Sequence, residues 1–93
     1  MLVGTWRKMA HPDCAALYPA VLQFDANGLY HGAPEPPGQF TSWDVGTWRI
    51  DDPGHVMIST ANDAVIRYAF ALTDAELTVT DQAGCRFTYR REA

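Results

Sequence analysis

Turn-forming residues divide this chain into short stretches at regular intervals. Clusters rich in Asp, Asn, Gly or Pro occur at 25–28, 34–38, 51–54, 61–63, 73–75 and 81–84. They accept positive φ angles or preset a turn, and the stretches between them are rich in β-branched and aromatic residues. Spacing this short leaves no room for crossover helices, so neighbouring strands are expected to pair antiparallel. The pattern predicts eight strands, at about 2–9, 20–25, 28–33, 42–51, 55–60, 64–72, 76–80 and 85–91, with at most one short helical turn near 12–18.

Alternation of apolar and polar residues assigns one apolar face to each predicted strand. The residues predicted to face inward are Trp6, Leu22, Phe24, Tyr30, Trp48, Ile50, Val56, Ile58, Ile66, Tyr68, Phe70, Leu77, Val79, Phe87 and Tyr89. A meander with a single apolar face is most economically closed into a barrel, because closure pairs the first strand with the last and removes both edges. We therefore predict one all-β domain over 1–93, an eight-stranded antiparallel up-and-down barrel.

Aromatic residues set a limit on any internal cavity. The chain has three Trp, four Tyr and four Phe, and most of them fall on the inner face. An eight-stranded barrel has an interior just wide enough to be filled by side chains or to hold one small ligand. We expect a ligand site, if one is present, to be small and lined by Tyr30, Trp48, Tyr68 and Tyr89, whose polar tips would orient the ligand.

The pentapeptide Val-Gly-Thr-Trp-Arg occurs twice, at 3–7 and at 45–49, without similarity beyond it. Gly4 and Gly46 would each let a strand bend or approach its neighbour closely, and the Trp two residues later lies on the same face. Both glycines, together with Trp6, are predicted to be positions that close the barrel.

Three segments resemble the small bacterial lipocalin-like domains of the calycin group. They are Leu2–Trp6, Phe24–Tyr30 with its Asp-Ala-Asn-Gly turn, and Gly46–Ile50 followed by Val56-Met57-Ile58. The resemblance implies that Trp6 lies inside the closed end of the barrel beneath an Arg from the end of the last strand. Strand parity favours Arg91 over Arg90 for this role, with a cation–π contact of roughly 0.5–2 kcal/mol. Typical lipocalins are much longer, so a roomy cup is not expected here.

Charge and hydropathy exclude two classes of partner. Seven Lys+Arg against eleven Asp+Glu give a formal charge of −4, so nucleic acid is not expected as a partner. Arg7, Lys8, Arg86, Arg90 and Arg91 are expected to form a local basic patch that is neutralised by cross-strand carboxylates such as Glu92. No apolar run is long enough for a membrane helix. We expect no membrane association and no cofactor.

The two cysteines do not by themselves decide the cellular compartment of the protein. Paired, Cys14 and Cys85 would close a loop of about 70 residues and stabilise the fold by about 4 kcal/mol. Because no signal peptide is evident, the prediction favours reduced thiols in a cytoplasmic protein. The alternative is a secreted or periplasmic protein in which the chain has been trimmed and the two cysteines are bonded.

Few residues carry reactive chemistry. His11 and Cys14 have the spacing of a metal pair but lack further ligands, so no metal site is predicted. His31 and His55 are isolated, and either would be a candidate general base only if strand pairing placed it beside Asp44 or Asp52. The stiff, Pro-rich segment 31–40 is interpreted as a connector, with a lid or a partner-binding loop as the alternative.

These observations predict a non-catalytic binding protein for a small apolar or aromatic molecule or for a protein partner, with homodimerisation as a further possibility. The first alternative is a small inhibitor-type barrel stapled by its disulfide and acting through the 31–40 loop. The second is a small enzyme using His31 or His55.

Overall fold

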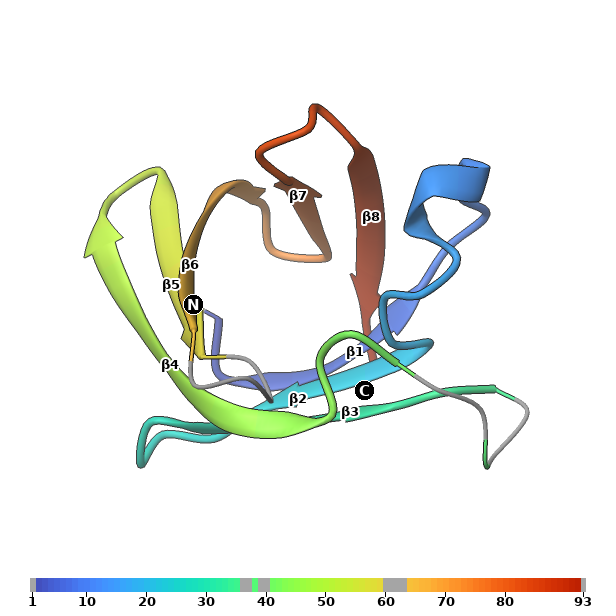
Figure 1. Cartoon of the computed structure of the whole chain (residues 1–93). Helices are drawn as coiled ribbons and strands as arrows, with labels where there is room; N and C mark the ends of the chain where they lie inside the picture. The colour runs from blue at the N-terminus through green and yellow to red at the C-terminus, as the bar shows by residue number, and fades with distance from the viewer. Residues whose placement is uncertain (1, 36–37, 39–40, 60–63, 93) are drawn as a thin grey trace.

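The computed structural model describes residues 2–35, 38, 41–59 and 64–92, and these residues form a closed antiparallel barrel (Figure 1). The strands are β1 (Gly4–Lys8), β2 (Val21–Phe24), β3 (Leu29–Ala33), β4 (Val45–Asp52), β5 (His55–Ser59), β6 (Val65–Leu72), β7 (Glu76–Thr80) and β8 (Arg86–Arg91). One 3-10 turn, η1 (Asp13–Ala15), lies between β1 and β2. The predicted fold class, strand order and short helical turn are therefore confirmed.

Each strand pairs antiparallel with the next one, and β8 returns beside β1 to close the ring (Figure 1). In the closing ladder Trp6 pairs with Arg91 and Arg7 pairs with Arg90. Turn chemistry supports the hairpins: the Asp25–Gly28 turn is closed by the Gly28 amide on the Asp25 carbonyl at 3.1 Å, and Gly28 takes a φ of 89°. The positive φ explains why glycine suits this turn.

The inner face of the barrel forms one hydrophobic core. Its buried residues are Leu2, Trp6, Ala15, Leu22, Phe24, Tyr30, Trp43, Val56, Ile58, Tyr68, Leu77, Val79, Cys85, Phe87 and Tyr89. Trp48, Ile66 and Phe70, which were predicted to face inward, are partly buried and pack against this core. The core contains most of the predicted inward residues because strand parity is set by the backbone and not by the loops.

The prediction was wrong for Ile50, which is 49% exposed. The register of β4 against β5 shifts between Ile50 and Asp52, and the β3–β4 ladder stops at the pair Leu29–Thr47. The last residues of β4 thus extend beyond the strand that would cover them. Alternation alone does not reveal a bulge or the end of a neighbouring strand.

Two sets of connections lie at opposite ends of the barrel. At the Trp6 end, so named here, lie residues 2–3, the turns 25–28, 53–54 and 73–75, and residue 92. At the Trp43 end lie the segment 9–20, the described part of the 34–44 connection, and the turn 81–85. No helix within the described residues is long and apolar enough to span a membrane.

Candidate functional site

The polar tips of the predicted ligand-binding tyrosines are directed at the protein itself. Tyr30 and Tyr89 are fully buried. The Tyr30 hydroxyl donates to the Ser59 carbonyl at 2.6 Å, and the Tyr89 hydroxyl donates to the Pro19 carbonyl at 2.8 Å. Burial raises the pKa of Tyr30 to about 12 and also raises that of Tyr89 well above its usual value, so both remain neutral donors.

The other two predicted ligand-binding residues also have internal partners. The Trp48 indole N–H donates to the Asp25 carbonyl at 3.0 Å. The Tyr68 hydroxyl accepts a hydrogen bond from the indole N–H of Trp43 at 3.2 Å. Among the described residues, every buried side-chain nitrogen or oxygen has a hydrogen-bond partner. The four residues thus lie on the inner face as expected, but their polar atoms serve the barrel itself.

The Trp6 end is closed by residues from the two terminal strands. The guanidinium carbon of Arg91 lies 4.2 Å from the centroid of the buried Trp6 ring, in the arrangement that the family resemblance implies. The Trp6 N–H donates to the Leu2 carbonyl at 3.0 Å, and Arg91 donates to the Val3 carbonyl at 3.0 Å. A Cβ at Gly4, which has a φ of 141°, would lie 2.7 Å from the Arg91 guanidinium. Gly4 therefore makes room for the arginine that covers Trp6.

Gly46 allows a close approach of a different kind. A Cβ there would lie 2.9 Å from the Tyr30 ring and would also overlap the Ser59 hydroxyl. Ser59 is the residue whose carbonyl accepts the Tyr30 hydroxyl, so Gly46 keeps the space in which β3, β4 and β5 meet. The second Gly-Thr-Trp is thus a packing position like the first, although its Trp48 is less buried than Trp6.

The Trp43 end is covered by four aromatic rings. Tyr18 stacks on Phe87 at a centroid distance of 4.2 Å, and it contacts Trp43 edge-on at 5.1 Å. Trp43 in turn contacts Tyr68 edge-on at 4.9 Å. Tyr18 and Trp43 were not among the residues predicted to face inward. Tyr18 lies in a connection, where strand alternation gives no information. Trp43 fell within the predicted strand 42–51 on the face opposite Trp48, but β4 begins only at Val45, so alternation does not set its direction.

Cys14 and Cys85 are joined by a disulfide, so the prediction of reduced thiols was wrong for this structure. Their Cα atoms are 6.0 Å apart, which lies within the normal range for such a bond. Both cysteines lie at the Trp43 end, where the 9–20 segment meets the 81–85 turn. With its sulfur in this bond, Cys14 supplies no thiolate to a metal beside His11, whose Nδ1 lies 2.8 Å from the Pro12 carbonyl.

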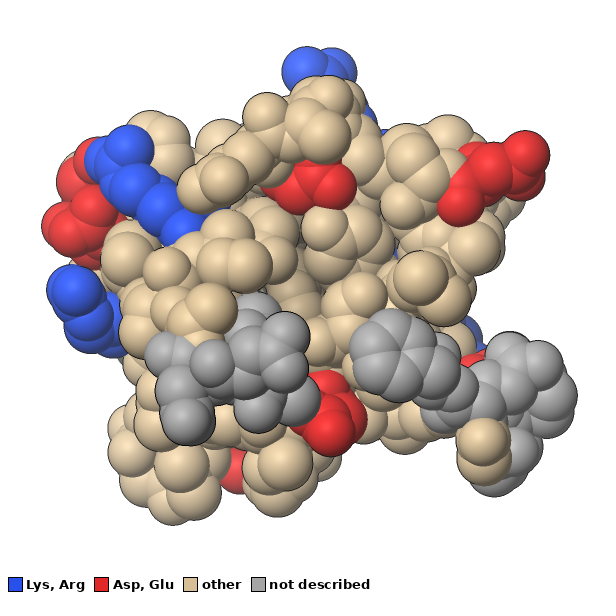
Figure 2. Space-filling view, in the orientation of Figure 1, with Lys and Arg blue, Asp and Glu red and all other residues tan. Residues whose placement is uncertain are grey.

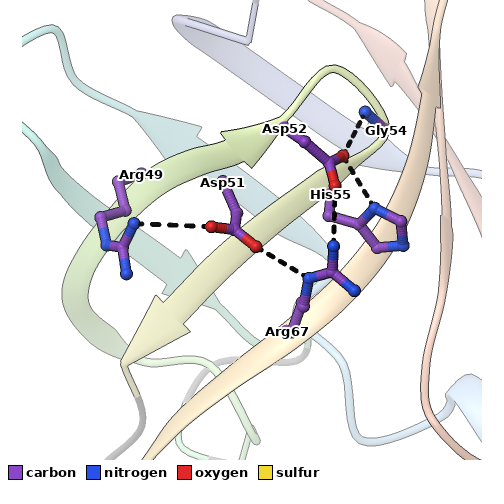
Figure 3. A network of polar contacts seen from close by, with 6 residues as sticks. All are labelled: Arg49, Asp51, Asp52, Gly54, His55 and Arg67. Carbon is purple, nitrogen blue, oxygen red and sulfur yellow. Dashed lines mark hydrogen bonds and ion pairs between the residues drawn. The ribbon is translucent and has the colours of Figure 1, made fainter.

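A charged network lies on the outer face of β4, β5 and β6 (Figure 3). Arg67 donates to Asp51 at 2.9 Å and to Asp52 at 2.7 Å, and His55 Nδ1 lies 2.8 Å from Asp52. The hydrogen bonds from His55 and from the Gly54 amide lower the pKa of Asp52. These groups are one third or more exposed, so water screens their mutual attraction.

Strand pairing thus places His55 beside Asp52, as a general base would require, whereas Nε2 of His31 lies 3.4 Å from Oδ2 of Asp25. A surface pocket of about 250 Å³ adjoins His55 and Arg67 and is bordered by Thr80, Asp81 and Gln82. No Ser or Cys nucleophile is among these lining residues. The arrangement orients a histidine and holds charges together, but it lacks an activated nucleophile.

Two of the five basic residues expected to form a patch, Arg7 and Arg90, lie near carboxylates. Arg7 forms ion pairs with Glu35 at 2.9 Å and Glu92 at 2.7 Å, and Arg90 lies 3.9 Å from Glu76. On the face shown in Figure 2, acidic and basic side chains are interspersed.

A second surface pocket, of about 210 Å³, lies between the 9–20 segment and the start of the 34–44 connection. Its lining includes Arg7, Lys8, His11 and Glu35, which makes it polar. Of the predicted loop 31–40, residues 36, 37, 39 and 40 lie outside the described residues. The candidate functional site is therefore the Trp43 end, which combines the aromatic cover, the disulfide and this pocket.

Comparison with known protein families, curated proteins and solved structures finds no match for this chain.

Proposed function

We propose that this chain is a non-catalytic, lipocalin-like binding protein whose partner is another protein, contacted by the surface of the Trp43 end. The observation that carries the proposal is the use of the inward polar groups. Tyr30, Trp48 and Tyr89 donate to carbonyls within the barrel, and Tyr68 accepts from Trp43, so these polar groups support the barrel instead of lining an open cup. The resemblance to lipocalin-like domains supports the scaffold, and the Arg91–Trp6 contact adds to it.

The surface of the Trp43 end is suited to a partner because several contacts position its loops before binding. The disulfide joins the 9–20 segment to the 81–85 turn, and the Leu17 carbonyl accepts bonds from the Ser42 amide at 2.7 Å and the Thr41 hydroxyl at 3.0 Å. Loops fixed in this way lose little conformational entropy when they bind. The Leu17 side chain in the 9–20 segment is 56% exposed and offers an apolar anchor.

The disulfide also bears on the compartment. Structural disulfides persist in oxidising environments and are rare in the cytosol of mesophiles. We propose a secreted or periplasmic location in place of the cytoplasmic one predicted from the sequence.

Site-specific photo-crosslinking tests the proposal. A photoreactive phenylalanine analogue at Leu17 is expected to yield a discrete covalent adduct with a protein in native host extract. The same group at Leu29, a leucine of comparable exposure (41%) beside the opposite end, is the matched control and is expected to yield none. Equal labelling from both positions would contradict the proposed surface.

Native mass spectrometry of freshly purified protein provides the second arm. We expect the disulfide form without a retained small molecule, and a retained apolar compound would instead favour an internal ligand site. Joint substitution of His31 and His55 by Ala is expected to leave the Leu17 adduct unchanged. Loss of the adduct in this variant would favour the histidine-based alternative. The same spectra report whether the chain is a homodimer, which remains a prediction.

A further inference from the structure

Tyr18 is a loop residue whose ring occupies a cage built by other parts of the chain. Phe87 of β8 stacks on it with an interplanar angle of 19°, while Trp43 and Tyr68 present edges to it at 72° and 87°. Trp43 precedes β4, and Tyr68 lies in β6. These three residues are buried in the barrel core, whereas Tyr18 reaches them from the irregular 9–20 segment. Aromatic rings at such distances and angles bind one another favourably.

The hydroxyl of Tyr18 has a fixed acceptor at the rim of this cage. Asp81 Oδ2 accepts it at 2.9 Å. Asp81 Oδ1 accepts the amides of Ala83 at 2.9 Å and Cys85 at 2.8 Å, so the 81–85 turn holds the carboxylate in place. The cage therefore combines a slot for a planar ring with a charged acceptor for a hydroxyl, which together match a phenol.

The segment that carries Tyr18 is attached at a few points and not by a strand ladder. The Lys8 ammonium donates to the carbonyls of Ala15 at 2.9 Å and Tyr18 at 2.7 Å. The Leu17 carbonyl accepts the bonds from Ser42 and Thr41 described above, and the disulfide holds Cys14. The only regular element of the segment is the three-residue turn η1. Segments with few such attachments open locally at lower cost than strands. None of these attachments is a strand pair, so displacement of Tyr18 would leave the strand ladders unbroken.

We propose that the cage formed by Trp43, Tyr68, Phe87 and Asp81 is a binding site for a phenolic ring, with Tyr18 as its internal competitor. The Cys14–Cys85 disulfide determines how readily a phenolic ring displaces Tyr18 from the cage. This site goes beyond the protein-binding surface proposed above and does not depend on it. The phenolic ring belongs either to a free small molecule or to a tyrosine side chain of a partner, and the probes below distinguish these two sources.

The first experiment removes the competitor. Tyr18→Ala, with the disulfide intact, is titrated with p-cresol and with toluene by calorimetry. We expect p-cresol to bind Tyr18→Ala at least about tenfold more tightly than it binds the wild type, and about tenfold more tightly than toluene binds, because only p-cresol donates to Asp81. Met9→Ala, which removes an exposed apolar side chain from the same 9–20 segment, is expected to behave as the wild type. Failure of p-cresol to bind the folded Tyr18→Ala variant overturns the proposal.

Two further variants test the parts of the site. Asp81→Asn in the Tyr18→Ala background is expected to reduce the preference for p-cresol over toluene severalfold, while an unchanged preference would remove Asp81 from the site. Cys14→Ser together with Cys85→Ser, with Tyr18 intact, is expected to bind p-cresol severalfold more tightly than the wild type. Equal affinity would overturn the role of the tether.

N-acetyltyrosinamide serves as the probe for a ring carried by a polypeptide. Tighter binding of this amide than of p-cresol assigns the site to a partner's tyrosine, and the reverse order assigns it to a free phenol. If Tyr18→Ala does not fold, Tyr18→Val takes its place, and a rise in its thermal midpoint with added p-cresol is the readout. No rise in a folded Val variant contradicts the proposal.

Discussion

The two ends of the barrel use different parts of the chain to achieve the same closure. At the Trp6 end, the ring and the arginine that covers it belong to β1 and β8, which are paired in one ladder. At the Trp43 end, the two rings added to the strands, Tyr18 and Trp43, come from connections, and a disulfide ties one of these connections down. Closure by strands resists local opening because it shares the cooperativity of the sheet. Closure by a tethered loop is expected to open locally at lower cost, and both proposed binding sites lie at that end.

The largest expected effect is the loss of stability when the tryptophan at either end of the barrel, Trp6 or Trp43, is replaced. Trp6→Ala is expected to lower the free energy of unfolding by about 3–5 kcal/mol, because the strand ladder around it cannot collapse into the space. Trp43→Ala is expected to cost less, since its backbone lies outside a strand and is able to relax. Urea unfolding of both variants measures the difference. A greater loss for Trp43→Ala would reverse this comparison.

Removal of the disulfide is expected to affect the two ends unequally. Cys14→Ser with Cys85→Ser should lower the free energy of unfolding by about 2–4 kcal/mol, because the unfolded chain regains the entropy of an open loop. Amide hydrogen exchange should accelerate in the 9–20 segment and remain slow in β1 and β8 near Trp6. Uniform acceleration across the barrel would show that the tether supports the whole fold and not one end.

Alkaline pH should lower the free energy of unfolding through tyrosine hydroxyls that form hydrogen bonds at the Trp43 end. The hydroxyls of Tyr18, Tyr30 and Tyr89 bond groups at this end, and burial raises the pKa of each above the usual 10.0. The unfolded chain loses these protons near pH 10 while the folded chain keeps them, so stability falls as pH rises above 10.

For Tyr30 this loss is expected between pH 10 and about 12, with a slope of up to about 1.4 kcal/mol per pH unit. Unfolding by urea at stepped pH, followed together with tyrosinate absorbance, measures it. Tyr30→Phe is the control and should give a shallower slope. An identical slope would mean that Tyr30 already titrates in the folded protein.

The smallest expected effect tests the cover of Trp6. Arg91→Met should lower the free energy of unfolding by about 1–2 kcal/mol, through loss of the cation–π contact and of the hydrogen bond to the Val3 carbonyl. Arg90→Met, on the neighbouring and more exposed residue, should cost no more than about 0.5 kcal/mol. Equal costs would indicate that Arg91 contributes only as a surface residue.

Prediction from the sequence succeeded where the backbone geometry of strands decides the outcome. The position of Arg91 over Trp6 followed from parity together with a family resemblance, and Tyr30 and Tyr89 lie inside as alternation requires. It failed at Ile50, where a register shift and the end of a neighbouring strand leave the side chain exposed. Alternation carries no information about either feature.

The candidate site was predicted less well than the fold. Tyr68 was expected to help line a ligand site and does contribute to the cage, but Tyr18, Trp43 and Asp81 were not foreseen. All three lie outside the strands, where side-chain direction depends on how a loop crosses the end of the barrel. The pairing of Cys14 with Cys85 likewise depends on two connections meeting in space.

The sequence by itself determined an antiparallel meander with one apolar face, because turn residues and period-two alternation act locally on the backbone. Only the tertiary structure decided how the two ends of the barrel close, which partners the inward-facing polar groups bond, and whether Cys14 and Cys85 meet. These outcomes depend on distances between segments far apart in the chain, which are set only when β8 returns to pair with β1.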